Sequence, residues 1–271
     1  MANDRSRWRA KLGSRPKLDD IDPRSTAGAP GDKRETNESL PELHEKLAAL
    51  QERLWGEGTR SLLVVLQAMD AAGKDGTVKH VFAGMNPMGV QAVAFKAPSE
   101  EERSHDFLWR VHAHAPRKSQ VGIFNRSHYE DVLIARVNNL VPESVWRPRY
   151  GAIRDFEELL TAEGTTIVKL YLHISKEEQA DRFRARLDEP TKRWKFSAAD
   201  LDVRENWDDY MDAYRDAMKE TSTPSSPWYV VPADRKWYRN WAVSRILIET
   251  LEDMNPQFPA EEPGLGRIVI E

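Results

Sequence analysis

The chain has 271 residues, of which 40% are hydrophobic and 31% are charged, and its net charge is −4. This composition predicts one large α/β domain or two small ones, and no apolar run reaches the ~18–20 residues that a membrane span needs. The negative net charge argues against a general nucleic-acid partner, so a polyanionic ligand would need a local basic patch. The chain has no cysteine, which excludes disulfides and thiolate metal sites. We expect a cytoplasmic protein, because the basic N-terminus also lacks the apolar segment of a secretory signal.

Taken in chain order, the sequence predicts an arm followed by alternating strands and helices. Residues 1–37 are rich in charged residues, proline and glycine and are expected to form an extended or mobile arm. Leucines at helical spacing predict the first helix over residues 39–55. A continuous apolar run predicts a buried strand at 62–66, and further strands are expected at 90–95, 120–124, 166–173 and 228–231. A helix is expected to follow the loop after the first strand and to end at about residue 82. The remaining helices are expected at 99–115, 129–138, 143–162, 175–187, 198–220 and 236–254, and the one at 143–162 is expected to kink at Pro148.

Strands that alternate with helices predict right-handed βαβ units. A small-residue loop that ends in Gly73 and Lys74 follows the first strand, and a polar loop follows the third. The expected fold class is therefore α/β, a three-layer P-loop kinase-like fold. It has a five-stranded parallel sheet, helices on both faces and a helical lid at about 182–198. The catalytic domain is expected over residues 38–255, and residues 256–271 are expected to form a loosely packed tail. Ligands bind outside the carboxyl ends of such strands, so the loops at 67–76, 125–129 and 232–236 are expected to meet at one site.

Residues 61–81 combine a strand, a small-residue loop and a helix, which is how a chain builds a phosphate cradle. Compared with the usual pattern G-x-x-x-x-G-K-[ST], Ala68 replaces the first glycine and Asp75 replaces the hydroxyl residue. Gly73 and Lys74 are retained, and Lys74 is expected to neutralise the transferred phosphoryl group, although a surface lysine is the simpler alternative. The remaining residues expected to bind phosphate in this loop are Ala71, Ala72, Gly73, Asp75 and Gly76.

Two carboxylates of the loop are candidate metal ligands. Asp70 would repel a phosphate unless a cation lay between them, so Mg²⁺ coordination is the most economical interpretation. Asp70 is alternatively a base that deprotonates an attacking phosphate, or a residue that caps the following turn. Asp75 stands where a hydroxyl group usually meets the metal, but it is equally explained as an acid favoured by the helix dipole.

The loop at 125–131, NRSHYED, offers a second group of polar side chains. Asn125 has a neutral oxygen for a metal or a water, and Arg126 has the planar fork that suits phosphate oxygens. Glu130 and Asp131 either belong to the site or simply begin the next helix, where acids are favoured.

A third group is basic. Arg182 and Arg186 are four residues apart and share one helix face, and a basic segment that includes Lys195 follows them. This group is expected to form a mobile lid that closes on phosphate and excludes water, with a solvated charged face as the alternative. Lys96 and Lys236 are expected to add positive charge at the ends of strands.

Four stretches together resemble the polyphosphate kinase 2 family, over roughly residues 40–254. They are QAMDAAGKDGTVKHV, GIFNRSHYEDVL, RLDEPTKRWKFS and STPSSPWYVVPADRKWYRN. The resemblance implies Mg²⁺-dependent phosphoryl transfer, with Mn²⁺ as an alternative metal, between inorganic polyphosphate and a nucleotide. Adenine nucleotides are the expected acceptors, with guanine nucleotides as an alternative. The resemblance also implies a homodimer or a homotetramer.

Carried over residue by residue, Asp70 and Lys74 match the acid and the lysine of the family's phosphate loop. Arg126 matches the arginine of its second motif, and Arg182 and Lys195 fall in its lid. The residues expected to be catalytic are Asp70, Lys74, Arg126 and Arg182.

The family's second motif also indicates which residues would bind the metal and which nucleotides would accept the phosphoryl group. Many members have aspartate where this chain has Asn125, and Asn125 with Glu130 resembles the class III subgroup, which phosphorylates both AMP and ADP. The expected metal ligands are Asp70 and Asn125. Met88 and Gly89 match the family's nucleoside-clamping region.

The sequence leaves three functional hypotheses. The leading one is a polyphosphate-dependent kinase that converts AMP or ADP to ADP or ATP, reversibly. The first alternative is an ATP-dependent small-molecule or nucleotide kinase on the same fold. The second is a non-catalytic regulator that binds polyphosphate or nucleotides.

Overall fold

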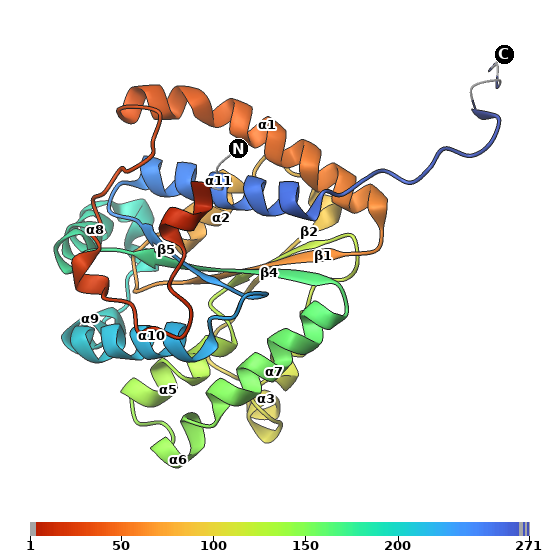
Figure 1. The fold of residues 1–271 in the computed structure, drawn as a ribbon. Helices are drawn as coiled ribbons and strands as arrows, with labels where there is room; N and C mark the ends of the chain where they lie inside the picture. The colour runs from red at the N-terminus through yellow and green to blue at the C-terminus, as the bar shows by residue number, and fades with distance from the viewer. Residues whose placement is uncertain (1–3, 266–267, 269, 271) are drawn as a thin grey trace.

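The computed structural model describes residues 4–265, 268 and 270, and a five-stranded sheet lies at its centre (Figure 1). The strands pair in parallel in the order β2-β3-β1-β4-β5. β1 lies between β3 and β4, and all its residues are buried. The predicted α/β fold with a five-stranded parallel sheet is therefore confirmed. The bounds are β1 (Ser61–Gln67), β2 (Val90–Ala94), β3 (Val121–Asn125), β4 (Thr165–His173) and β5 (Trp228–Pro232).

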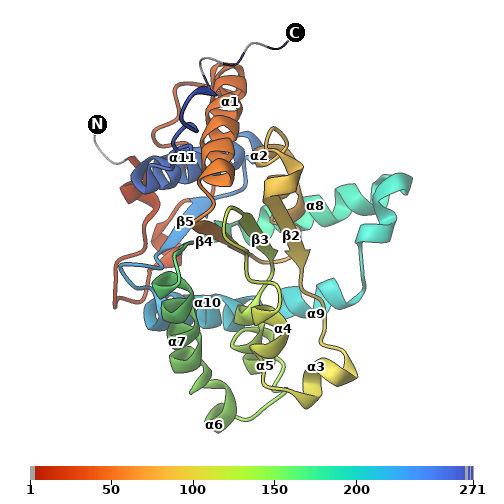
Figure 2. The ribbon, with the colours of Figure 1, turned by 90° about the vertical axis from the view of Figure 1, so that its right-hand side faces the viewer.

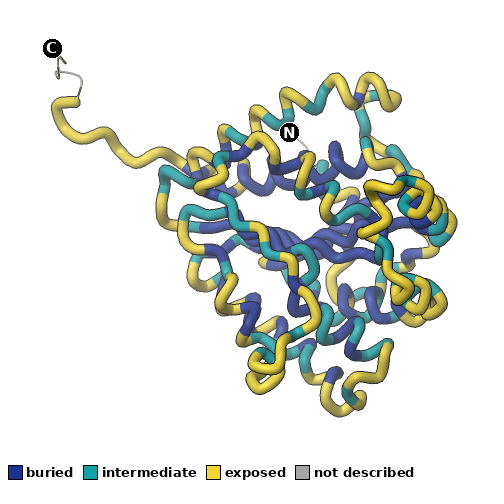
Figure 3. Tube along the Cα trace, turned by 180° about the vertical axis from the view of Figure 1, so that it is seen from behind, coloured by how far each residue is buried: buried dark blue, intermediate teal, exposed yellow. Residues whose placement is uncertain are grey.

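Helices cover both faces of the sheet, as expected for buried parallel strands (Figures 1 and 2). One face is covered by α1 (Lys33–Glu57), α2 (Lys74–Val81) and α11 (Lys236–Met254). The other is covered by α5 (Ile134–Val137), α7 (Arg149–Ala162) and α10 (Trp207–Thr221). The strands and the inner sides of the helices form the buried core in Figure 3. Within the described residues, no helix is both long enough and apolar enough to cross a membrane.

The lid region consists of α8 (Lys176–Asp188), the 3₁₀ helix η5 (Pro190–Lys195) and α9 (Ala199–Glu205). In Figure 2, α8 extends away from the sheet and the chain returns through α9 to α10. The helix predicted at 198–220 is thus two helices. Asn206 separates them, and its side-chain amide donates to the Asp202 carbonyl at 3.0 Å. Such side-chain bonds compete with the helix ladder, which explains the break.

Other predicted helices are also interrupted. The predicted kink at Pro148 is a boundary between α6 (Glu143–Trp146) and α7. The helix predicted at 99–115 is replaced by α3 (Glu100–Ser104) and α4 (Trp109–His112), because the Asp106 carboxylate accepts the Leu108 N–H at 2.9 Å and starts a new turn. The predicted helix at 129–138 begins as the 3₁₀ helix η4 (His128–Asp131) before α5. A further 3₁₀ turn, η3 (Pro87–Gly89), precedes β2.

The helix predicted to start at Ser39 begins earlier. α1 begins at Lys33, because Asp32 and Glu35 form a capping box in which each side chain accepts the other residue's backbone N–H. The pattern of leucines gave no sign of this start, since the first turns of the helix are largely polar.

Residues 4–32, which precede α1, lie along the domain. They include η1 (Asp4–Trp8) and η2 (Leu18–Asp20) and are otherwise extended. Trp8 is buried, and its indole N–H donates to the Tyr238 hydroxyl at 3.1 Å. Arg9 forms an antiparallel bridge with Tyr229, which covers the free edge of β5. The division into arm, domain and tail stays a prediction. In Figure 1 the described part of the tail leaves the domain.

A buried ion pair joins α7 to β4. The Lys169 ammonium lies 2.6 Å from the Glu157 carboxylate, and both side chains are at most 1% exposed. Lys169 also donates to the Thr221 carbonyl at 2.8 Å, and the Tyr129 hydroxyl donates to Glu157 at 2.7 Å. Burial by itself would raise the pKa of Glu157, but Lys169 and the surrounding hydrogen bonds hold it at about 2. Because Tyr129 follows β3, its bond to Glu157 connects the loop after β3 to the core.

We expect Glu157→Ala to lower the free energy of unfolding by about 3–5 kcal/mol, because it leaves the Lys169 charge buried without a partner. Urea denaturation measures this value. Glu158→Ala, at the exposed neighbouring position on α7, is the matched control. A loss of less than about 1 kcal/mol in Glu157→Ala would contradict the importance of the pair.

Candidate active site

The loop between β1 and α2 has the shape of a phosphate cradle. It leaves the carboxyl end of β1 after Gln67, and α2 begins at Lys74. Ala71 and Gly73 adopt left-handed backbone angles, with φ of 61° and 105°. Gly73 is suited to this angle because it has no Cβ, and it lets the loop turn directly into the helix. The N-terminus of α2, with its unpaired N–H groups, thus faces the end of the sheet where ligands bind.

Lys74 folds back over this loop. Its ammonium donates to the Ala68 carbonyl at 2.7 Å, and its side chain lines the cavity described below. Burial lowers the pKa of Lys74, and the nearby Asp70 carboxylate opposes that change. The group is a cation held at the centre of the loop.

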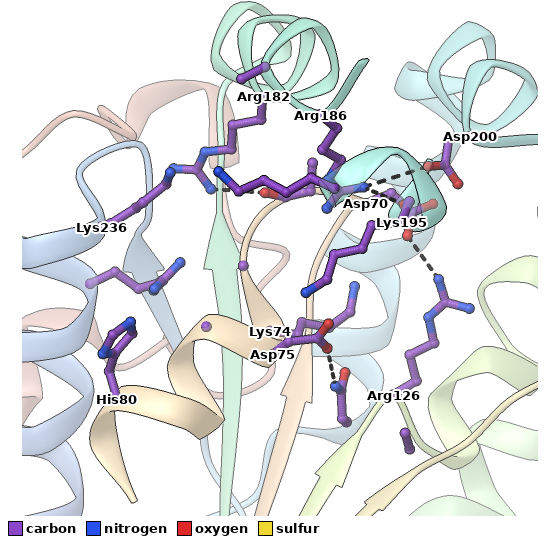
Figure 4. A pocket seen from close by; sticks show the side chains of 18 of the residues that line it. Asp70, Lys74, Asp75, His80, Arg126, Arg182, Arg186, Lys195, Asp200 and Lys236 are labelled. Carbon is purple, nitrogen blue, oxygen red and sulfur yellow. Dashed lines mark hydrogen bonds and ion pairs between the residues drawn. The ribbon is translucent and has the colours of Figure 1, made fainter. Parts of the chain in front are cut away.

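Asp70 and Arg126 join the loops that follow β1 and β3. The Arg126 guanidinium lies 2.8 Å from the Asp70 carboxylate (Figure 4). Arg126 has a left-handed φ of 62°, and its backbone N–H donates to the Leu66 carbonyl at 3.1 Å. Because this bond anchors the backbone to β1, the arginine is positioned beside the phosphate loop.

A second contact between the same loops joins Asn125 to Asp75. The Asn125 amide N–H donates to the Asp75 carboxylate at 2.7 Å (Figure 4). Asn125, Asp70 and Asp75 thus all line the cavity. Oxygen donors of this kind suit a hard divalent cation.

Arg182 is buried and holds the phosphate loop from behind. Its Nε donates to Glu178 at 2.8 Å. Its two terminal nitrogens donate to four backbone carbonyls, those of Ala71, Ala72, Ala233 and Asp234, at 2.7–2.9 Å. A guanidinium has five N–H groups, so every donor of Arg182 is used within the protein. The side chain therefore fixes the backbone of the loops after β1 and β5.

The lid contributes further charges above the loop. Arg186 donates to the Lys195 carbonyl at 3.1 Å and lies 3.7 Å from the Asp200 carboxylate. The Lys195 ammonium lies 5.0 Å from the centre of the Trp194 ring, and Trp194 is 78% exposed. The bonds from Arg186 join α8 to the end of η5 and to α9.

These elements enclose a cavity of about 650 Å³. It is lined by most of the predicted site residues, namely Asp70, Ala71, Gly73, Lys74, Asp75, Gly76, Lys96, Asn125, Arg126, Arg182, Arg186, Lys195 and Lys236. The loops after β1, β3 and β5 therefore meet as the carboxyl-end rule predicts.

The other predicted residues do not line the cavity. The Ala72 carbonyl faces the buried arginines. Asp131 pairs with Arg149 at 3.1 Å; burial raises the pKa of Asp131, and Arg149 opposes the rise. Burial likewise raises the pKa of Glu130, which the charges of Arg126 and Lys74 oppose.

Met88 and Gly89 lie outside the cavity on the turn before β2. Met88 is 70% exposed. A Cβ at Gly89 would lie 2.1 Å from the Gln51 amide nitrogen, so this glycine packs against α1. A nucleoside contact at these residues would require a base that extends beyond the cavity.

Several lining residues were missed by the sequence analysis. They include His80, Phe95, Trp194, Asp200, Arg239 and Asn240. One signal was present for Arg239, because it follows Lys236 by three residues and so shares its face of α11. The aromatic residues carried no comparable signal.

The arrangement is suited to chemistry on phosphate groups. Several cations line the cavity around the loop, and so do the oxygen donors Asp70, Asp75 and Asn125. Among the residues that the structure describes, no cluster of three or more histidines, cysteines or acids forms a metal cage. Mg²⁺ needs no such cage, since it is commonly held by one or two carboxylates together with substrate phosphates.

Comparisons with known proteins identify the family. The family described as polyphosphate kinase 2 matches residues 31–259. A protein of Meiothermus ruber named AMP/ADP-polyphosphate phosphotransferase is 53% identical over 265 residues, which cover 98% of this chain and 99% of that protein. An ADP-polyphosphate phosphotransferase of Rhodopseudomonas palustris is 48% identical over 239 residues and covers 84% of this chain and 83% of the relative.

A solved structure agrees with these sequence matches. The crystal structure of polyphosphate kinase 2 from Arthrobacter aurescens TC1 superposes with a TM-score of 0.92 at 48% identity. The match covers 96% of this chain and 93% of that one. With its phosphate loop, its second motif and its lid all meeting at one cavity, this chain belongs to the polyphosphate kinase 2 family.

Proposed function

We propose that the protein transfers a phosphoryl group from inorganic polyphosphate to AMP and ADP, giving ADP and ATP, in a reversible reaction. The observation that carries the proposal is a single cavity in which one phosphate loop is flanked by cations from three loops and a lid. The names of the relatives from Meiothermus ruber and Rhodopseudomonas palustris support the choice of donor and acceptors. Adenine nucleotides are the proposed acceptors, and a Mycobacterium tuberculosis relative named GDP-polyphosphate phosphotransferase makes guanine nucleotides worth testing.

In this proposal the charges of the cavity lower the barrier to transfer. The bond from the donor oxygen to the terminal phosphorus breaks, while an oxygen of the acceptor's last phosphate forms the new bond. Lys74 and Arg126 neutralise the charge that spreads over the transferred group, and Lys195 and Arg186 add positive charge when the lid closes. Closure also excludes water, which would otherwise accept the phosphoryl group. The acceptor phosphate is already ionised near neutral pH, so no strong base is needed.

The oxygens of Asp70 and Asn125, with Asp75 beside them, fit a bound Mg²⁺, and Mn²⁺ fits the same donors. Such an ion would supply charge neutralisation between the two phosphates. Asp70 otherwise repels a phosphate, and its ion pair with Arg126 at 2.8 Å only partly offsets this charge. Glu130 adds a further acid next to Arg126 and Lys74.

We assign Arg182 a positioning role rather than a direct contact with phosphate. All its donors are used by the protein, and four of them hold the backbone of the loops after β1 and β5. A residue that fixes these loops affects transfer through their geometry. We also propose a cytoplasmic location, consistent with a chain without cysteine, and a homodimer or homotetramer.

The proposal is tested by incubating the purified protein with AMP or ADP, polyphosphate and Mg²⁺ and separating the nucleotides by chromatography. ADP and ATP should form only when polyphosphate is present. Consumption of added ATP with no dependence on polyphosphate would favour an ATP-dependent kinase instead. Binding of polyphosphate without any product from AMP, ADP, GMP or GDP would favour a regulator.

Replacing Lys74 by Ala should lower kcat/KM by about 100-fold or more, because the loop loses the cation that lies at its centre. The fold should remain intact, as judged by circular dichroism. Lys79→Ala, an exposed position on the same helix outside the cavity, is the matched control and should retain activity. Near-normal turnover by Lys74→Ala would overturn the role assigned to this lysine.

A further inference from the structure

Arg239, in the first turn of α11, lies buried directly behind the phosphate loop. Its side chain is only 2% exposed, yet it forms part of the cavity wall. Its Nη1 donates to the Ala72 carbonyl at 3.1 Å. Its Nε and Nη2 both donate to the Asn240 side-chain oxygen, at 3.2 and 2.8 Å. Arg239 thus contacts the loop at the same carbonyl that Arg182 holds at 2.8 Å.

The charge of Arg239 has no acidic partner within the described part of the chain. All its acceptors are neutral amide oxygens, whereas Arg182 pairs with Glu178 at 2.8 Å. Burial, with a further contribution from Arg182, lowers the pKa of Arg239 to about 9, so it remains mostly charged at neutral pH. A buried charge without a counter-charge is costly, which indicates that an anion belongs beside it.

Two glycines of the phosphate loop make room for this guanidinium. A Cβ at Gly73 would lie 1.9 Å from Nη1 of Arg239, and a Cβ at Gly76 would lie 3.2 Å from Nη2. The absence of side chains at these positions therefore lets the charge approach the backbone that forms the cradle.

Donors also remain for a ligand on this side of the cavity. Arg239 has five N–H groups, and the bonds to Ala72 and Asn240 use three of them. Lys236 lines the cavity with Arg182 and Arg239, and burial together with the charges of these two arginines lowers its pKa. In Figure 4, Lys236 lies on the side of the cavity away from Arg126. The wall formed by Arg182, Arg239 and Lys236 carries more positive charge than Glu178 balances.

The hydrogen bond from Arg239 to the Ala72 carbonyl also affects the direction in which the Gly73 N–H points. The Ala72 carbonyl and the Gly73 N–H belong to one planar trans peptide and point in opposite directions. Two arginines that hold the carbonyl on the buried side therefore hold the Gly73 N–H away from themselves. Within the described residues, no acceptor is found for that N–H.

We propose that Arg239 is a positioning residue for the condensed phosphate that the loop binds. Its unpaired charge is neutralised by that phosphate, and its bond to Ala72 keeps the loop in the binding geometry. The proposal rests on the proposed function for the identity of the anion. It predicts that Arg239 contributes to phosphate binding while contributing little to the stability of the protein without ligand.

Thermal unfolding with and without tripolyphosphate and Mg²⁺ tests this proposal without any nucleotide. In Arg239→Met, the Tm of the free protein should stay within about 4 °C of wild type. The rise in Tm on adding tripolyphosphate should be smaller in Arg239→Met than in wild type, by the amount expected if the variant binds tripolyphosphate roughly 10- to 100-fold more weakly. Arg245→Met, on the same helix at a position paired with Glu249 outside the cavity, should keep the full rise.

Two further variants separate charge from packing. Arg239→Lys keeps the charge and should recover part of the ligand-induced rise in Tm and of kcat/KM for polyphosphate. Arg239→Gln keeps a donor for the Ala72 carbonyl but has no charge, and it should behave like Arg239→Met. If Arg239→Met does not fold, Arg239→Gln carries the comparison.

A ligand-induced rise that is the same in wild type, Arg239→Gln and Arg239→Met would overturn the proposal. So would the absence of any rise in wild type, because no phosphate would then occupy the loop. A large rise in wild type that Arg239→Met loses, together with no nucleotide product from wild type, would support the role of Arg239 and contradict the proposed function.

Discussion

The site depends on one backbone carbonyl, that of Ala72, which accepts hydrogen bonds from Arg182 of α8 and Arg239 of α11 at 2.8 and 3.1 Å. The loop between β1 and α2 is thereby tied to the helix that leads into the lid and to the last helix of the chain. Arg182 extends the connection to the loop after β5 through the carbonyls of Ala233 and Asp234. Three segments distant in sequence are thus fixed around one peptide group, which gives the phosphate loop a defined shape before a ligand arrives.

This anchoring explains how a loop with unusual residues keeps the geometry of a phosphate cradle. The first glycine and the hydroxyl residue of the common pattern are absent, and Asp70 and Asp75 bring negative charge to the cavity. The structure balances these acids locally, since Asp70 faces Arg126 and Asp75 accepts from Asn125. Arg239 and Lys236 line the cavity and form no ion pair within the described part of the chain, and Lys236 lies on the side away from Arg126 (Figure 4). The cavity therefore has one side suited to a divalent cation and another suited to phosphate oxygens alone.

Sequence reasoning was most successful where local pattern and global fold agree. Largely apolar segments located the five strands, and the rule on carboxyl ends brought Lys74, Asn125 and Lys236 to one cavity. It failed where the outcome depends on contacts between distant residues. Helical spacing placed Arg182 on a face of the lid helix, but spacing does not show that carbonyls from two other loops use its donors. Arg239 was missed for the same reason, and polar side chains that bond to the backbone broke helices that looked continuous.

The proposed role of the acids of the loop is to act with a divalent cation between two phosphates. It is tested most directly by measuring the initial rate of ADP formation from AMP and polyphosphate as free Mg²⁺ is titrated from an excess of EDTA, in wild type and in Asp70→Asn. No transfer should be detectable in EDTA, activity should recover saturably with Mg²⁺, and Asp70→Asn should show a much weaker apparent affinity for Mg²⁺. Transfer at the full rate in EDTA, or an unchanged Mg²⁺ dependence in Asp70→Asn, would contradict it.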